Sequence, residues 1–269
     1  MDILLFFQYS FIQKAFVAGA FIAVVCSTLG LFLVLRKMSL IGDGLSHVSF
    51  GAIALGLFLG VYPFYVAIPV VVVSSLFILK ISEKAKVYGD AAIGIVSAVG
   101  IASGVIFASK STGFSVDIFS YLFGNILSIS TFEVVLVIVL SLTVLTVLYL
   151  YYWDLFSATF DEEYAKTTGV KTDSINVLLT ILTGITVVLS VKVVGIMLIS
   201  ALLILPAVTA LQIARSFRAA IVLGAIFALA SVLVGIGVSF FFDMPTGATI
   251  VLMNAAIFGL TLSLKKLSA

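Results

Sequence analysis

Charged side chains are scarce in this sequence. Only 10% of its 269 residues are charged, 63% are hydrophobic, and the mean hydropathy is +1.36. An ordinary soluble domain carries about 25% charged residues, so this chain cannot cover its surface with groups that water solvates. The composition therefore excludes a soluble protein and predicts a multi-pass protein that lies almost entirely in the bilayer.

Cysteine and histidine are almost absent as well. The single cysteine, Cys26, excludes an intramolecular disulfide, and its apolar surroundings favour a small buried hydrophobic side chain. The sequence has no phosphate-binding loop of the form GxxxxGK[ST], and a Ser/His/Asp arrangement would need the one histidine, His47, which has another use below. We therefore expect no enzyme activity, no ATPase site and no permanently bound cofactor.

Apolar stretches follow one another along the whole chain. A membrane-crossing helix needs about 20 predominantly apolar residues, and charges, Pro and Gly mark the breaks. The predicted spans are 15–35, 47–60, 62–80, 91–108, 131–152, 174–191, 193–212, 219–241 and 246–264. Because 47–60 is short, we expect eight or nine crossings, preceded by an interfacial or lead-in segment from Ile3 to Gln13. The chain is predicted to form one all-α transmembrane domain over 1–269.

The distribution of Lys and Arg predicts the orientation, because cytoplasmic loops carry an excess of these residues. With nine spans and the C-terminus inside, 11 of the 14 basic residues lie on the cytoplasmic side, and the outer three are Lys14, Lys110 and Lys192. The inner set is Arg36, Lys37, Lys80, Lys84, Lys86, Lys166, Lys171, Arg215, Arg218, Lys265 and Lys266. The opposite orientation would violate the rule.

Two connections are long. The outer one, 109–130, contains Asp117 but is too apolar for a free loop, so we expect a short or re-entrant helix that folds back onto the bundle. The inner one, 153–173, places Asp161, Glu162 and Glu163 at the start of a helical stretch, where acids suit the helix dipole. Gly169 fits a helix stop. A short helix of about Asp161 to Thr168 is therefore predicted on the cytoplasmic side, either as a solvated loop helix or as a contact for a partner.

Asp43 and His47 are the strongest candidates for chemistry. They are four residues apart, so on a helix their side chains share one face. An imidazole nitrogen and a carboxylate oxygen suit zinc and other first-row divalent metals, although zinc usually takes four ligands. The alternative is an Asp that caps the helix and a His that is hydrogen-bonded to it, with no metal. If two copies pack about a two-fold axis, two Asp and two His supply four ligands.

Small and kink-forming residues accompany these candidates. Gly42, Gly44, Gly51 and Gly56 permit close approach of neighbouring backbones. Pro206 predicts a kinked span, in which Ser200 or Thr209 would hydrogen-bond the carbonyl that Pro leaves free, and ordinary packing is the alternative there.

Five stretches carry a resemblance in chain order. The first, RKMSLIGDGLSHVSFGAIALG (36–56), has a basic pair, a G-D-x-[LI]-[SG]-H core and a Gly-rich continuation. The others are GDAAIG (89–94), DIFSYLFGNIL (117–127), FDEEYAKTTGV (160–170) and VGIMLISALLILPAVTA (194–210). Together they resemble the bacterial metal-uptake permeases of the ABC-3 family, over nearly the whole chain.

The resemblance implies a permease of the type II ABC importer architecture, similar to that of the vitamin B12 importer. It implies a homodimer in the cell membrane, cytoplasmic ATPase subunits that supply the energy, and an extracytoplasmic solute-binding protein that delivers the metal. Asp43 and His47 would be the metal ligands. The segment 154–173 would couple to the ATPase through Asp161, Glu162, Glu163, Ala165 and Gly169. Membrane lipid surrounds such a protein, and no nucleic-acid partner is expected.

The resemblance implies that the transported metal is a divalent cation, and we expect zinc rather than manganese or iron(II). Manganese-type members of the family often carry a Pro after the His, whereas this chain reads Ser46-His47-Val48-Ser49-Phe50-Gly51, which looks closer to the zinc type. Histidine also suits zinc better than it suits manganese. Alternatives are a manganese, iron(II) or metal-chelate importer, a secondary cation transporter that uses Asp43 and His47 as a proton relay, and a membrane scaffold.

Overall fold

Helices make up the secondary structure that the computed structural model describes, over residues 9–84, 89–110, 121–124 and 129–268. In the first half these helices are α2 (Ser10–Leu35), α3 (Ile41–Phe58), α4 (Pro63–Lys84), α5 (Gly89–Lys110), α7 (Thr131–Leu150), α8 (Tyr152–Phe160) and α9 (Glu162–Thr167). The second half contains α10 (Thr172–Val194), the 3-10 turn η2 (Ile196–Leu198), α11 (Ile199–Ile213), α12 (Phe217–Phe242) and α13 (Thr246–Ser268).

Eight of the described helices are long and apolar enough to cross a membrane, and α11 is a ninth, shorter apolar helix. With 15 residues, α11 is about 22 Å long, which is less than the roughly 30 Å of a hydrocarbon core. The expectation of eight or nine crossings in an all-helical bundle is confirmed. Helices are the expected element because each satisfies its own backbone hydrogen bonds where water is absent.

The predicted bounds are wrong at three places. The helix predicted over 47–60 begins at Ile41, so Asp43 and His47 both lie inside α3 rather than at its edge. The span predicted over 193–212 is instead broken, since α10 runs on to Val194 and the chain turns at Gly195, with φ of +87°, before η2 and α11. The first span is also longer than predicted, because α2 already begins at Ser10.

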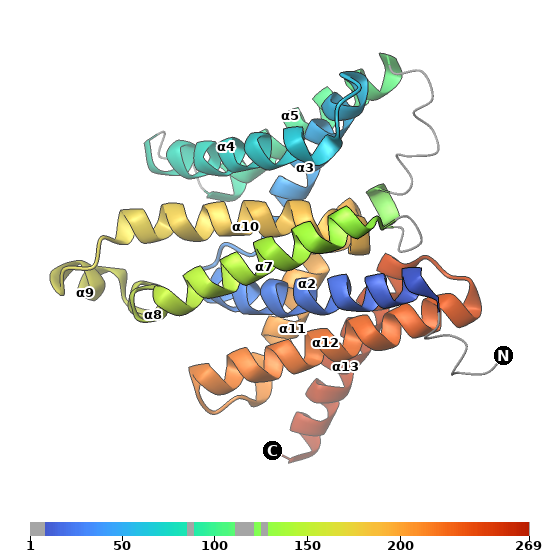
Figure 1. Ribbon diagram of the computed structural model, residues 1–269. Coiled ribbons are helices and arrows are strands. Elements are labelled where there is room, and N and C mark those ends of the chain that lie inside the picture. The colour runs from blue at the N-terminus through green and yellow to red at the C-terminus, as the bar shows by residue number, and fades with distance from the viewer. Residues whose placement is uncertain (1–8, 85–88, 111–120, 125–128, 269) are drawn as a thin grey trace.

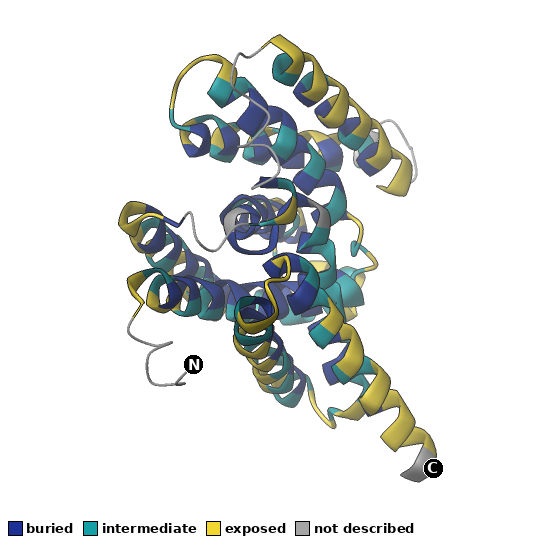
Figure 2. Cartoon of the chain, turned by 90° about the vertical axis from the view of Figure 1, so that its right-hand side faces the viewer, coloured by how far each residue is buried: buried dark blue, intermediate teal, exposed yellow. Residues whose placement is uncertain are grey.

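The bundle has an enclosed centre. Figure 1 shows α3, α4 and α5 grouped on one side, α12 and α13 on the other, and α2, α7 and α10 between them. Two-thirds of the apolar windows of α2, α3 and α10 are buried, whereas about a third or less is buried in α4, α5, α7, α12 and α13. Figure 2 shows the same division, with exposed residues along the outward faces of the outer helices. Cys26 is fully buried in this centre, 3.3 Å from Ser190 Oγ, as a small core side chain.

The two ends of the bundle differ. Helices α8 and α9 lie at one end in Figure 1, together with the starts of α10 and α12, and the start of α2 lies at the other. Arg36 contacts Glu162, and Arg218 lies over the ring of Trp153, so predicted cytoplasmic cations gather at the end that carries α8 and α9. We therefore take this end as the cytoplasmic side.

The outer connection is described only in part, because Asp117 and most of 109–130 lie outside the described residues. Residues 121–123 are helical and Tyr121 is buried, so this part packs against the bundle. Gly124 has φ of +76°, and a Cβ there would come within 2.6 Å of the Val193 carbonyl oxygen. The chain thus passes close to the break between α10 and α11.

Candidate functional site

The turn between α2 and α3 sets where the candidate ligands begin. Lys37 adopts φ of +59°, and the Met38 N–H donates to the Leu33 carbonyl at 2.8 Å, which closes the end of α2. Helix α3 then starts at Ile41, and its N-cap residue Leu40 makes no side-chain capping bond. Asp43 is therefore not the cap that the alternative interpretation required. It lies in the first turn of α3, where the helix dipole stabilises a negative charge.

Asp43 and His47 share an uncovered strip of α3. Among residues 41–50, all are buried except Asp43, His47 and Phe50. These positions are four and three residues apart, which places them on one face of the helix. The Asp43 side chain is 49% exposed and that of His47 is 25% exposed, so both can reach a ligand. Over its first ten residues, α3 thus leaves open only the face that carries its two ionisable side chains.

The two side chains point toward one another. His47 Nε2 lies 3.7 Å from Asp43 Oδ2, which is an ion-pair distance rather than a hydrogen bond. The second carboxylate oxygen, Asp43 Oδ1, accepts a hydrogen bond of 3.0 Å from the Ser200 hydroxyl of α11. Ser200 therefore orients Asp43 instead of satisfying the carbonyl freed by Pro206, and Thr209 donates to the Leu205 carbonyl. The expected role of Ser200 and Thr209 at Pro206 is wrong.

One copy of the chain offers an incomplete metal site. Within the described part of the chain, no three His, Cys, Asp or Glu side chains come close enough to hold a metal ion together. Asp43 and His47 supply two donors, and the Ser200 hydroxyl already donates its proton to one of them. The open strip leaves room for donors from a second chain.

Glycines allow the packing that encloses the rest of α3. A Cβ at Gly44 would lie 2.5 Å from Ile93 Cγ2, and one at Gly51 would lie 2.5 Å from the Gly100 carbonyl oxygen. Both distances are closer than side chains tolerate, so α3 and α5 meet backbone to backbone, as helices in membranes often do. This close contact leaves the Asp43 and His47 face as the open one.

The cytoplasmic segment forms the predicted short helix, preceded by a second helix that sequence reasoning missed. The Asp161 side chain accepts a hydrogen bond of 2.9 Å from the Tyr164 N–H, so Asp161 is the N-cap of α9. Gly169 has φ of +91°, and the Val170 N–H donates to the Ala165 carbonyl at 3.0 Å, which closes the helix in a Schellman motif. The predicted bounds at Asp161 and Thr168 are thus the two caps of α9.

Ala165 anchors α9 and the acids face outward. Ala165 is fully buried, whereas Asp161 and Glu163 are exposed and Glu162 is half-buried. Gly169 is exposed, and a Cβ there would meet open space, so its positive φ and not crowding favours glycine. The structure therefore brings the five predicted coupling residues to one short projecting segment.

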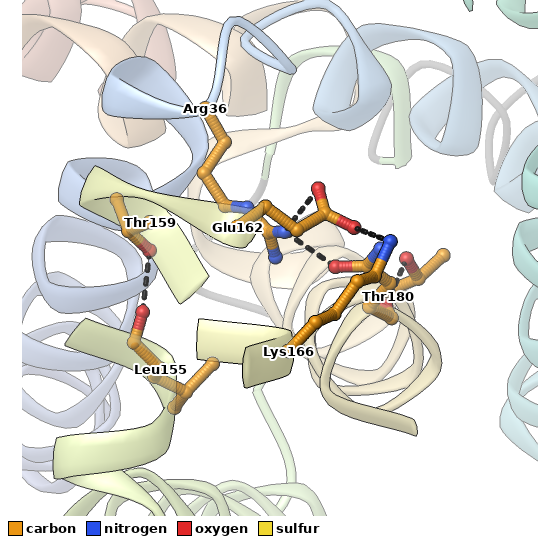
Figure 3. Close-up of polar contacts among 7 residues, drawn as sticks. Arg36, Leu155, Thr159, Glu162, Lys166 and Thr180 are labelled. Carbon is orange, nitrogen blue, oxygen red and sulfur yellow. Dashed lines mark hydrogen bonds and ion pairs between the residues drawn. The ribbon is translucent and has the colours of Figure 1, made fainter. Parts of the chain in front are cut away.

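Arg36 ties α9 to the end of α2. Figure 3 shows Arg36 and Lys166 on either side of Glu162, with Arg36 Nη2 3.8 Å from Glu162 Oε2 and Lys166 Nζ 3.2 Å from Glu162 Oε1. Arg36 also donates to the side-chain oxygen of Asn176 in α10. Its side chain is only 7% exposed, and burial lowers the pKa of the guanidinium while Glu162 opposes that shift. The bond to Glu162 raises the pKa of Lys166.

Two contacts of the site were not predicted. Ser200 and Asp43 are 157 residues apart in the sequence, and Arg36 and Glu162 come from different helices. Neither pair has a local pattern that would reveal it. The one signal in the sequence is the position of Arg36, which lies beside a Gly-rich polar stretch between two apolar segments. A cation at such a place needs a partner.

Comparisons with known proteins agree over the whole length of the chain. The model of the ABC 3 transport family matches residues 8–265. The chain is 32% identical over 253 residues to the manganese transport system membrane protein MntC of Halalkalibacterium halodurans, covering 94% of this chain and 87% of that protein. It is 30% identical over 255 residues to the high-affinity zinc uptake system membrane protein ZnuB of Haemophilus influenzae, covering 95% and 98%.

A solved structure has the same fold. A chain of PsaBC from Streptococcus pneumoniae, solved in complex with Fab, superimposes with a TM-score of 0.88 at 30% sequence identity. The match covers 97% of this chain and 95% of that one, so it includes α3, α8 and α9 as well as the spanning helices.

Proposed function

Because the chain belongs to the ABC 3 transport family, we propose that it is the membrane-spanning subunit of an ATP-binding cassette importer for a divalent metal ion. One observation carries the proposal: the only open face on the first ten residues of α3 holds Asp43 and His47. Ionisable side chains within membrane-spanning helices are costly, and they often mark ion pathways. The names of relatives, which include manganese and zinc transport proteins, support the same class of cargo.

Two copies would complete the site. If the open strips of α3 face each other across a two-fold axis, Asp43 and His47 from both chains provide two carboxylates and two imidazoles. Four such donors match the ligand number that zinc prefers. Ser200 would hold each carboxylate in place through its bond to Asp43 Oδ1. Separation of the two halves would break the ligand set and release the ion.

Zinc is the metal that we propose first. Imidazole suits zinc, whereas oxygen-rich sites suit manganese, and half of the four donors would be imidazoles. Sequence identity does not discriminate between the two, since the manganese relative is 32% and the zinc relative 30% identical. Manganese and iron(II) are therefore tested in the same experiment.

Energy would come from a separate ATPase subunit docked on α9. The helix projects at the cytoplasmic end with exposed acids at its start and a buried Ala165 at its base. Glu162 of α9 contacts Arg36 at the end of α2, and Arg36 bonds to Asn176 near the start of α10, so a displacement of α9 would act on both helices. A solute-binding protein on the outer side would deliver the ion.

Transport in vesicles tests the proposal. The chain is reconstituted with its ATPase subunit and solute-binding protein, and ATP-dependent uptake of zinc, manganese and iron(II) is compared for the wild type, Asp43→Asn and His47→Ala. We expect both variants to lose uptake, and we expect one zinc bound per two wild-type chains. Ser49→Ala is the matched control, because Ser49 lies on the buried side of the same helix and, among the described residues, donates to the Leu45 carbonyl alone.

Other outcomes would contradict the proposal. Normal uptake by His47→Ala would remove the imidazole from the mechanism. Metal uptake driven by a proton gradient without an ATPase would indicate a secondary transporter. If manganese is taken up and the protein does not bind one zinc per two chains, zinc is the wrong metal, but the assignment as a metal importer still holds.

A further inference from the structure

A long apolar groove lies on the side of the molecule away from Asp43 and His47. It has a volume of about 920 Å³, at the upper end of the roughly 300–1,000 Å³ of small-molecule sites. Side chains of α2, α7 and α12 line it, with α8 at one end, and no residue of α3, α5 or α11 contributes. The groove is therefore separate from the proposed metal site.

The length of the groove along the helices is about the thickness of one membrane leaflet. Its lining on α12 runs from Arg218 to Leu229, and the 11 steps between these residues rise about 16 Å along the helix. Half of a hydrocarbon core is about 15 Å. The lining on α2 and α7 comes from their cytoplasmic halves, from Val24 to Phe32 and from Leu145 to Leu150. The groove thus spans the inner leaflet from its midplane to the headgroups.

Its cytoplasmic mouth is cationic and aromatic. The Arg218 guanidinium lies 5.4 Å from the centroid of the Trp153 ring and 6.0 Å from that of Tyr152. Among the described residues, no carboxylate pairs with Arg218. Aromatic and basic side chains of this kind are typical of the headgroup level.

No acidic side chain among the described residues neutralises the charge at this mouth. Ser216 caps α12, so Arg218 lies in the first turn, where the helix dipole is positive and no acidic residue is present. A cation is disfavoured there, and an anion is favoured by both the dipole and the guanidinium. Charge complementarity therefore selects an anionic occupant at the end of an apolar groove.

We propose that this groove binds one anionic phospholipid of the cytoplasmic leaflet, with its phosphate at Arg218 and its acyl chains along α2, α7 and α12. The site does not depend on the proposed transport function. Its ligand class follows from the leaflet depth of the apolar lining together with the unpaired cation at the headgroup level.

Trp153 makes the site directly testable, because it is the only tryptophan in the chain and lies at the mouth of the groove. The full chain is reconstituted in phosphatidylcholine vesicles that contain a small fraction of brominated phosphatidylglycerol or brominated phosphatidylcholine, and quenching of Trp153 fluorescence is measured. We expect phosphatidylglycerol to be preferred about five-fold over random mixing, the scale of one basic residue at an anionic surface. Inorganic phosphate should not reduce this preference.

Two pairs of variants separate the site from general effects. Arg218→Gln should reduce the preference to that of phosphatidylcholine, whereas Arg215→Gln removes the same charge from an exposed residue outside the groove and should retain it. Ala225→Phe fills the groove and should reduce quenching by both brominated lipids, whereas Ala230→Phe on the exposed face of α12 should not. Each variant is normalised to its own unquenched emission.

Equal quenching by the two lipids in the wild type would overturn the proposal, and so would equal losses in Arg218→Gln and Arg215→Gln. If neither brominated lipid quenches Trp153, protein covers the groove, and this result would also contradict the proposal. Competition by inorganic phosphate would indicate a headgroup-only anion site without acyl chains.

Discussion

The ion pair between Arg36 and Glu162 yields the sharpest prediction. Replacing Glu162 with Gln keeps the shape of the side chain but removes the charge that faces Arg36 at 3.8 Å. Arg36 is 7% exposed, and its Nη1 atom is buried without a hydrogen-bond partner among the described residues. In the variant, a buried cation keeps only Asn176 as a partner. Helix α9 should therefore dock less firmly on the bundle.

The size of the effect follows from distance and exposure. Two charges about 4 Å apart interact by roughly 4 kcal/mol at an effective dielectric of about 20. Desolvation of Arg36 and the 41% exposure of Glu162 reduce the net value, which places it between a surface pair and a buried one at about 1–2 kcal/mol. Opening of α9 should become roughly 5–30 times more frequent.

Amide hydrogen exchange over residues 161–170 measures this opening. Glu163→Gln is the matched control, because Glu163 is an exposed neighbour on the same turn, and its exchange should change little. Lys166→Ala removes only the exposed contact to Glu162 and should change exchange less than two-fold, the scale of an i,i+4 pair. Equal exchange in Glu162→Gln and Glu163→Gln would refute the reasoning.

Three further predictions concern packing and protonation. In denaturant unfolding, Gly51→Ala should lower the free energy of unfolding by about 1–3 kcal/mol, because the new Cβ would overlap the α5 backbone. Gly237→Ala is the control, since open space surrounds Gly237, and it should be neutral or stabilising by up to about 1 kcal/mol. Burial and the hydrogen bond to Glu133 raise the pKa of the Tyr62 phenol above its ordinary 10.0. The protonated phenol therefore stabilises the folded protein below pH 10.0, and this stabilisation is lost as the pH rises further. Tyr62→Phe should remove the part of the alkaline fall in unfolding temperature that comes from this phenol. Cys26, fully buried, should resist maleimide labelling in the folded protein and react after denaturation, and rapid labelling of the native protein would show that the centre of the bundle opens.

The spanning helices could be predicted because composition and length determine them. Stretches of about 20 apolar residues have no alternative in a bilayer, and the predicted spans were found as helices apart from the breaks already described. The short cytoplasmic helix could be predicted as well, since Asp161 and Gly169 carry the local chemistry of a helix start and stop. These features depend on residues that are close in the sequence.

The start of α3 could not be predicted in the same way. The sequence GDGLSH is polar and rich in glycine, which favours a loop when only hydropathy is considered. In the structure it is helical because Gly44 and Gly51 let α5 cover the helix at backbone distance. Burial supplied by α5 and α11 thus overrides local propensity, and no window of sequence contains that information.

The arrangement of α2 and α3 connects the two candidate sites. Arg36, the partner of Glu162, ends α2, and Asp43 lies in the first turn of α3, so only a tight turn separates them. That turn is held by hydrogen bonds from Lys37 to Val34 and from Met38 to Leu33, with Lys37 at a positive φ that costs a non-glycine residue about 1–2 kcal/mol. These bonds, and that from the Ile41 N–H to the Met38 carbonyl, fix the end of α2 against the start of α3. Movement of α9 against α2 would therefore shift the start of α3, and with it the face that carries Asp43.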